Sequence, residues 1–310
     1  MDNPAANKFP GNIDFIVDPA CEAMTITPKG KIQLRQVDPW ALAFMKDWEL
    51  KNSGVINNII FQISSGTGRS QAIESFMRRV SFLSVANGIR ITVRLDGKER
   101  RLYDLQTLVS RSPEEAIRIY QSIKPRGDAD KPGRIEKDFQ TFLFGKGLDR
   151  QVRSNERLAV LGEDFYKLEK KSYRIIREFP TGAFNGKISE TKRILPTDYI
   201  DIVTLNKYGE LALIELKLND PKLEVISQIL DYALFFRCYF DRLAPYLYRE
   251  FEGKIKSKKI VAYIANNHFH PMFDSIRGFY CGDKLGIEIK TSTLGFTEII
   301  GATGNPSRNS

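Results

Sequence analysis

The stretch PTDYIDIVTLNKYGELALIELK, from Pro196 to Lys217, decides how the second half of this chain folds. Residues 201–205 are rich in β-branched and apolar residues, a composition typical of a strand. Turn residues follow at 206–209, where Gly209 can adopt a positive φ at little cost. The next segment, 210–218, is apolar around its charges, as expected for a strand buried on both faces. The stretch therefore predicts a β-hairpin.

Three charged residues interrupt this predicted hairpin. Side chains at i and i+2 of a strand point to the same face, so Glu215 and Lys217 share a face. The hairpin can also bring Asp201 alongside Glu215. Charges in a buried strand are costly unless they are paired or bind a metal, which favours a functional site over a solvated surface. Two carboxylates supply the hard oxygen ligands that Mg²⁺ or Mn²⁺ prefers.

A helix is predicted to follow the hairpin. Asn219-Asp220-Pro221 is typical of a helix start, and the residues after it are mostly apolar, so the helix should pack on the sheet. Gln228 and Tyr232 lie four residues apart and share one face of this helix. Taken alone, these two residues would be interpreted as an ordinary polar pair at a helix edge.

Together, these residues resemble the PD-(D/E)xK nuclease superfamily. The matching features are Asp201, the Glu215-Leu216-Lys217 triplet, and a Gln228–Tyr232 helix similar to the QxxxY element of RecB-like members. The resemblance covers roughly residues 133–300 and implies an α/β, restriction-endonuclease-like core, with a central mixed β-sheet flanked by helices. It also implies that Asp201 and Glu215 bind Mg²⁺ or Mn²⁺. Lys217 would position or activate water, and Gln228 and Tyr232 would support the site or touch DNA.

Two assignments within the resemblance stay open. The family often has a further glutamate on the helix before the sheet, and Glu136 fits as a third catalytic and metal-binding residue. It could equally be a first-turn glutamate favoured by the helix dipole. The usual Pro-Asp pair is broken, and Asp201 is preferred over the runner-up Asp198 because a strand follows Asp201 directly. Residues 136–162 also resemble the nuclease domain of Shedu-type phage-defence proteins.

The length of 310 residues predicts two domains. A small N-terminal α+β domain (1–124) with a regulatory or recognition role is expected to precede a Pro- and Gly-rich linker (125–133), the nuclease domain (134–300) and a disordered polar tail (301–310). The N-terminal domain is expected to contain strands at 13–17, 23–26, 32–37, 58–63, 89–95 and 100–105, and helices at 38–50, 71–86 and 113–123. The nuclease domain adds a helix at 134–144, strands at 174–179, 259–265 and 287–290, and a helix at 271–280.

Composition limits the class of protein. The chain is 42% hydrophobic and 27% charged, with a net charge of +9, as expected for a globular protein and compatible with nucleic-acid binding. No apolar run approaches the ~20 residues that span a bilayer, so a cytoplasmic protein without membrane contact is expected. The three cysteines have neither zinc-site nor disulfide spacing.

Several weaker signals in the sequence have plain structural explanations. Gly66-Thr67-Gly68-Arg69-Ser70 lacks the lysine and spacing of a phosphate loop, so a Gly-rich turn is favoured. His268 and His270 lack a third ligand at a recognisable spacing, so polar loop residues are favoured. Arg78-Arg79 forms one basic cluster, and the cluster at 254–259 could track a phosphate backbone or simply be a solvated loop.

The sequence therefore predicts a Mg²⁺-dependent deoxyribonuclease that acts as an endonuclease, with defence against phage or other foreign DNA as its role. DNA and further copies of the chain are the expected partners. The alternatives are a catalytically inactive nuclease fold that binds DNA or regulates a partner, and an RNA-directed nuclease.

Overall fold

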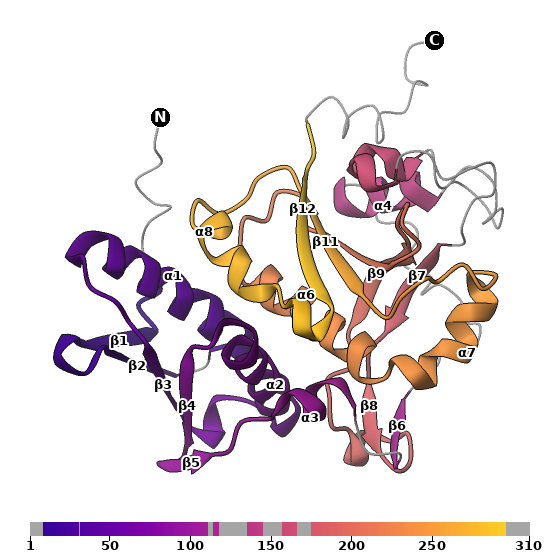
Figure 1. Cartoon of the computed structure of the whole chain (residues 1–310). Helices are drawn as coiled ribbons and strands as arrows, with labels where there is room; N and C mark the ends of the chain where they lie inside the picture. The colour runs from indigo at the N-terminus through magenta and orange to yellow at the C-terminus, as the bar shows by residue number, and fades with distance from the viewer. Residues whose placement is uncertain are drawn as a thin grey trace.

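The computed structural model describes residues 9–30, 32–110, 114–117, 135–144, 157–165 and 175–295. The chain is an α/β protein with two five-stranded mixed sheets flanked by helices (Figure 1). The first sheet has the order β1-β2-β3-β4-β5. Its strands are β1 (Ile13–Asp18), β2 (Ala23–Pro28), β3 (Asn58–Ile63), β4 (Arg90–Leu95) and β5 (Lys98–Arg100).

The N-terminal half is α/β and not α+β as the sequence predicted. Strands β2, β3 and β4 are mutually parallel, and the helices α1 (Leu34–Asn52) and α2 (Ser70–Asn87) connect them. The misassignment arose at 32–37, which was predicted as a strand but includes the first turn of α1. Leu34, Val37 and Ala41 are buried at helical spacing. The sequence predicts that this helix begins at residue 38, but Pro39 lies inside α1.

The second sheet has the order β12-β11-β10-β9-β7. Its strands, as they occur along the chain, are β7 (Ile176–Pro180), β9 (Tyr199–Leu205), β10 (Leu211–Leu216), β11 (Ile260–Asn266) and β12 (Ile287–Thr293). The predicted hairpin is present, because β9 and β10 pair antiparallel and Gly209 takes φ 75° in the turn between them. Strands β10, β11 and β12 are parallel. The central strand β10 is buried along its whole length.

Alternate residues of β10 enter two separate cores, as the period of a strand requires. Leu211 and Leu213 join the core on the side of α6 (Glu224–Cys238), whereas Ala212 and Ile214 join the core that contains α4 (Ile135–Phe144). The sheet is therefore covered on both faces, which explains why β10 is almost continuously apolar. A charged residue in this strand must find partners within the protein.

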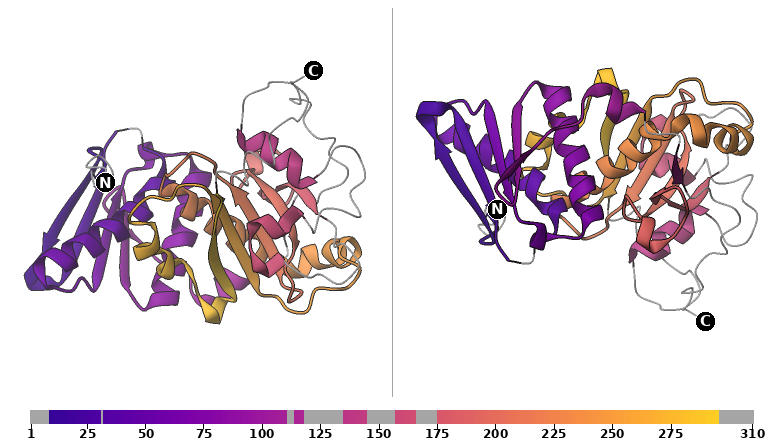
Figure 2. Two further views of the ribbon diagram at one scale, coloured as in Figure 1. Left: turned by 90° about the horizontal axis from the view of Figure 1, so that it is seen from above. Right: turned by 90° about the horizontal axis from the view of Figure 1, so that it is seen from below.

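The two halves of the molecule meet through helices. In Figures 1 and 2, α1 and α2 lie between the first sheet and α6, and α6 lies against the second sheet. One continuous core includes Phe76 and Val80 of α2 together with Leu230 and Leu234 of α6. The helix that carries the predicted Gln228–Tyr232 pair is thus sandwiched between the N-terminal half and the second sheet.

The remaining elements are short or peripheral. They are α3 (Leu105–Val109), β6 (Glu115–Ile117), β8 (Ala183–Asn185), α7 (Phe240–Glu250), α8 (Phe273–Arg277) and several short 3₁₀ helices. Two predicted elements are wrong in their described parts. The strand at 100–105 is replaced by β5, which ends at Arg100. Residues 115–117 of the predicted helix 113–123 form a strand, because β6 pairs antiparallel with the distant β8.

Helix α6 begins later than the sequence predicted. Asn219 takes a left-handed φ of 59°, and the helix starts at Glu224 instead of near Asp220. The backbone N–H of Asn219 donates to the side chain of Asn267 at 2.7 Å, so the polar residues here bind the end of β11 and do not cap α6. The predicted linker (125–133) and tail (301–310) lie outside the described residues. Among the helices of the described ranges, none has the length and apolar character needed to cross a membrane.

Candidate active site

The β9–β10 hairpin brings two of the predicted carboxylates together. Ile214 pairs with Ile202 at the end of the β9–β10 register, and Glu215 and Asp201 are the next residues on each strand. The Asp201 carboxylate accepts a hydrogen bond from the backbone N–H of Leu216 at 2.8 Å, which fixes Asp201 beside the end of β10. Lys217 is held one residue further on, where its N–H donates to the carbonyl of Ala265 at 2.9 Å.

Glu215 is the buried centre of this group. Its side chain is 2% exposed, and its Oε1 accepts hydrogen bonds from Lys217 Nζ at 2.6 Å and from Gln228 Nε2 at 2.8 Å. Its other oxygen, Oε2, is buried and has no hydrogen-bond partner among the described residues. An unpartnered oxygen of a buried carboxylate carries a free-energy cost of about 1–3 kcal/mol or more. The site thus contains an acceptor that is available for a ligand.

Gln228 and Tyr232 form the predicted pair on α6. Gln228 donates to the Tyr232 hydroxyl at 2.7 Å, and that hydroxyl donates to the backbone carbonyl of Tyr199 at 3.2 Å. The chain of contacts runs from Glu215 through both residues to the beginning of β9. The pair therefore joins the helix to both strands of the hairpin.

Helix α4 supplies a residue that the sequence did not identify. Gln140 donates to the carboxylate of Asp201 at 3.2 Å and accepts from the guanidinium of Arg177, on β7, at 3.1 Å. Glu136 lies one helical turn before Gln140, and its charge acts on Asp201, Glu215 and Lys217. The only sequence signal for Gln140 was its i+4 spacing from Glu136.

Burial and repulsion set the proton affinities of the site. Burial and the neighbouring Glu215 carboxylate raise the pKa of Asp201 well above its ordinary value. Burial raises the pKa of Glu215 as well, although Lys217 opposes the rise. Burial lowers the pKa of Lys217, but the attraction of Glu215 and Asp201 outweighs it, and the pKa is raised overall. Lys217 is therefore a stable cation at neutral pH and is unsuited to act as a general base.

The carboxylate oxygens of this site supply some of the ligands that a divalent cation needs. Asp201 and Glu215 offer hard oxygens, and the unpartnered Glu215 Oε2 is the kind of atom that a cation would satisfy. A cation would also relieve the repulsion between the two carboxylates. Within the described ranges, however, no three His, Cys, Asp or Glu side chains converge as a metal-binding group. Any cation would therefore depend on water or a bound phosphate for its remaining ligands.

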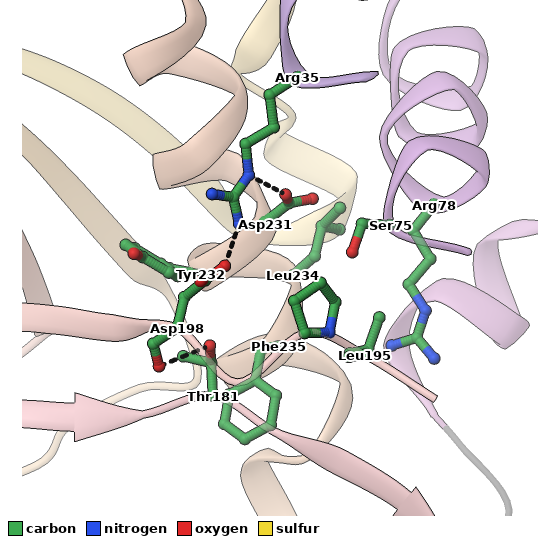
Figure 3. A pocket seen from close by; sticks show the side chains of 11 residues that line it. Arg35, Ser75, Arg78, Thr181, Leu195, Asp198, Asp231, Tyr232, Leu234 and Phe235 are labelled. Atoms are coloured by element: carbon green, nitrogen blue, oxygen red, sulfur yellow. Dashed lines mark hydrogen bonds and ion pairs between the residues drawn. The ribbon is translucent and has the colours of Figure 1, made fainter. Parts of the chain in front are cut away.

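Asp198, the alternative motif aspartate, has a different environment. Its carboxylate pairs with Arg35 of α1, and its backbone carbonyl accepts a hydrogen bond from Thr181 N–H at 2.9 Å. Figure 3 shows it in a cleft between the two halves, together with Asp231 and Tyr232. The cavity volume is about 20 Å³, which holds roughly one water molecule. Of the two aspartates, Asp201 is the one beside Glu215.

The weaker sequence signals receive structural explanations. His270 accepts from the N–H of Met272 at 3.1 Å and packs edge-on against Trp40. In the Gly-rich turn, the N–H of Ser65 donates to Asp96 at 2.8 Å. Both arrangements agree with the favoured interpretations as a polar loop and a plain turn.

The basic clusters do not line the site. Arg78 and Arg79 are buried at 2% and 0% exposure, so they are not a surface patch. Lys256 donates its N–H to the carbonyl of Gly209 at 2.9 Å, which places the 254–259 cluster at the hairpin turn. This turn precedes β10, whereas Glu215 and Lys217 lie at the opposite end of that strand.

Comparison with known proteins does not assign the chain to a family: no family model, no curated protein and no solved structure matches it.

Proposed function

We propose that this protein is a metal-dependent endonuclease that hydrolyses DNA phosphodiester bonds, and that its second sheet with α4 and α6 is a restriction-endonuclease-like core. One observation carries the proposal. The fold buries the Glu215 carboxylate, gives its Oε1 to Lys217 and Gln228, and leaves its Oε2 without a hydrogen-bond partner among the described residues. A purely structural carboxylate in such a place would be fully paired.

In this proposal Asp201 and Glu215 hold Mg²⁺ or Mn²⁺, with Glu136 close enough to contribute through its charge. When bound, the cation supplies positive charge to the phosphate oxygens and acidifies water. Lys217, a permanent cation, orients the attacking water and stabilises the negative charge that develops on the phosphate. Gln228 and Tyr232 keep Glu215 in place.

The test is a cleavage assay on supercoiled, linear and single-stranded DNA, with labelled RNA in parallel, in Mg²⁺, in Mn²⁺ and in EDTA. We expect cleavage of DNA only with the metals. Lys217→Ala should lower kcat about 10²- to 10³-fold, the usual effect of removing one charge-stabilising group. Lys284→Ala is the matched control, because Lys284 is exposed and precedes β12. Metal-dependent activity that survives both Glu215→Ala and Lys217→Ala would rule out this site.

A second candidate is a nuclease fold that binds DNA without cutting. It is favoured by the ion pair between Lys217 and Glu215, which already offsets the charge that a metal would neutralise. DNA binding in a gel-shift assay without cleavage under any metal condition would select this candidate. Cleavage of RNA alone would select an RNA-directed nuclease.

A role in phage defence and assembly into a homo-oligomer remain predictions from the sequence. Defence predicts that plasmid-borne expression protects cells from phage and that Lys217→Ala abolishes the protection. Oligomerisation predicts a smaller elution volume in size-exclusion chromatography, and a larger light-scattering mass, than one 35.4 kDa chain would give.

A further inference from the structure

Helix α6 presents two adjacent polar pairs to different parts of the molecule. Gln228 and Tyr232 contact Glu215 and the beginning of β9. Ser227 and Asp231 each precede them by one residue, which is a rotation of about 100° around the helix. This second pair contacts α1 and α2 of the N-terminal half. Any rotation of α6 would therefore change both sets of contacts.

A buried ion pair anchors α6 to the N-terminal half. Arg79 is fully buried, and its Nη1 donates to both carboxylate oxygens of Asp231 at 3.0 and 2.9 Å. Its other nitrogens donate to Asp38 and to the carbonyl of Leu34. Asp38 in turn accepts a hydrogen bond from Ser227 at 2.7 Å. This anchor is a permanent part of the fold, because removing one partner would leave a buried charge unpaired.

Arg35 makes a different connection. Its guanidinium contacts Asp231 on α6, at 3.4 Å, and also Asp198, the residue before β9 (Figure 3). The two elements that it joins are those that supply Tyr232 and Asp201 to the candidate site. The Arg35 side chain is 27% exposed at the edge of the cleft, so water can reach the carboxylates if it is removed. Its loss should therefore change the geometry of the site more than the stability of the fold.

We propose that Arg35, from the N-terminal half, is a positioning residue for the candidate active site: it fixes α6 relative to β9, and thereby fixes Gln228 and Tyr232 around Glu215. The effect on cleavage rests on the function proposed above, whereas the effect on α6 does not. Neither half of the molecule alone would then hold the site in its working geometry. Anything that displaced Arg35 from its two carboxylates would lower activity from a distance.

The kinetic test compares Arg35→Gln and Arg35→Lys with the unaltered protein in the plasmid-cleavage assay. Small misplacements of catalytic groups can cost up to about 100-fold in rate, so we expect Arg35→Gln to lower kcat roughly 10- to 100-fold with KM for DNA unchanged. Arg35→Lys should restore part of the rate, because an ammonium can pair with one carboxylate but cannot span both as the guanidinium does. Lys51→Gln, an exposed position on the same helix, should have no effect.

A double-mutant cycle separates positioning from a merely structural role. Arg35→Gln and Gln228→Ala should be strongly non-additive in kcat, because both act on Glu215 through α6. Lys51→Gln and Gln228→Ala should be additive. An unchanged kcat in Arg35→Gln, additive effects with Gln228→Ala, or a loss that only follows the fraction of unfolded protein would overturn the proposal.

Hydrogen exchange measured by mass spectrometry provides a readout independent of cleavage. Arg35→Gln should speed amide exchange in residues 224–238 relative to the unaltered protein, while the melting temperature stays within a few degrees. If the unaltered protein never cleaves but this exchange rises, the proposed function fails and the coupling of Arg35 to α6 stands. If the unaltered protein cleaves and neither exchange nor kcat changes in Arg35→Gln, the coupling fails and the proposed function stands.

Discussion

Asp38 and Glu215 are both acidic residues that the fold removes from water, at 0% and 2% exposure, yet their surroundings differ. Asp38 accepts hydrogen bonds from Arg79, Ser227 and Tyr280, and none of its oxygens is left without a partner. Glu215 accepts only through Oε1, and its Oε2 has no partner among the described residues. Burial alone therefore does not distinguish the two carboxylates, and the difference between them is the open acceptor of Glu215.

The two groups also share one helix. Ser227 and Asp231 connect α6 to the Asp38 group, which is Asp38 with its partner Arg79. Gln228 and Tyr232 connect α6 to the Glu215 group, which is Glu215 with Lys217 and Asp201. The first group should therefore determine stability, and the second should determine ligand binding and activity. Four experiments test this distinction.

The largest effect is expected from Arg79→Ala. The substitution leaves Asp38 and Asp231 without their cation, and breaking a buried ion pair in this way costs about 3–5 kcal/mol of the free energy of unfolding. Urea unfolding followed by circular dichroism measures this. Lys51→Ala removes an exposed ion pair on α1 and should change stability by no more than about 0.5 kcal/mol. Similar small effects in both variants would show that the Asp38 group does not hold the halves together.

The Glu215 group should respond to metal where the Asp38 group does not. Mg²⁺ or Mn²⁺ at 100 times its Kd should raise the free energy of unfolding by about 2.7 kcal/mol, because the metal binds only the folded state. Glu215→Gln should abolish this gain. Glu288→Gln, at the opposite end of the sheet beside Lys259, should retain it. A gain that persists in Glu215→Gln would place the metal elsewhere.

Stability should depend on pH through Asp201. Because its pKa is raised above the ordinary 3.8 in the folded state, the folded protein retains a proton that the unfolded chain releases. The unaltered protein therefore loses stability as pH rises from about 3.8 through the raised pKa, whereas Asp201→Asn loses less, because of the two carboxylates only Glu215 still has a raised pKa. In EDTA at pH 8, we expect the variant to be more stable than the unaltered protein, because it carries no buried carboxylate at this position that must hold a proton or an unfavourable charge.

Thermal unfolding between pH 4 and pH 8 measures this difference, which should shrink toward zero at the acidic end. The exposed Asp241→Asn serves as the control and should show no such trend. If Asp201→Asn were less stable than the unaltered protein at pH 8, the carboxylate would be satisfied within the fold, as Asp38 is.

The smallest effect is expected from Tyr232→Phe. The variant loses the hydrogen bond to the carbonyl of Tyr199 and the one received from Gln228, at a net cost of about 1 kcal/mol in stability. Tyr248→Phe, at a 43% exposed position on α7, should leave stability unchanged. Differential scanning calorimetry at neutral pH compares the two variants. Equal melting temperatures would show that Tyr232 contributes packing alone.

Local patterns in the sequence were sufficient for the centre of the candidate site. The i, i+2 rule of strands placed Glu215 and Lys217 on one face, and the i, i+4 rule of helices paired Gln228 with Tyr232. The hairpin brought Asp201 beside them, as its position before an apolar strand predicted. These relations depend on backbone geometry over a few residues, which is why they can be derived without knowing the fold.

Contacts between distant segments could not be derived in the same way. Arg79 lies 41 residues from Asp38 and 152 residues from Asp231, and the sequence identified Arg78-Arg79 only as a basic cluster. Residues 115–117 were predicted as part of a helix, but they form strand β6. Its pairing partner β8 lies far along the chain, so local patterns could not reveal the strand. The strand predicted at 32–37 failed for a local reason, since the apolar residues of this short mixed segment fit both the strand and the helix period.

Local sequence patterns were enough to predict the hairpin, the faces on which Glu215, Lys217, Gln228 and Tyr232 lie, and the chemistry that those side chains can offer. The packing of distant elements was needed to show that Gln140 holds Asp201 and that Arg35 and Arg79 connect α6 to the N-terminal half. The physical reason is that backbone periodicity fixes the direction of a side chain within its own element. Its partners are fixed by how the elements pack, and that depends on the whole core at once.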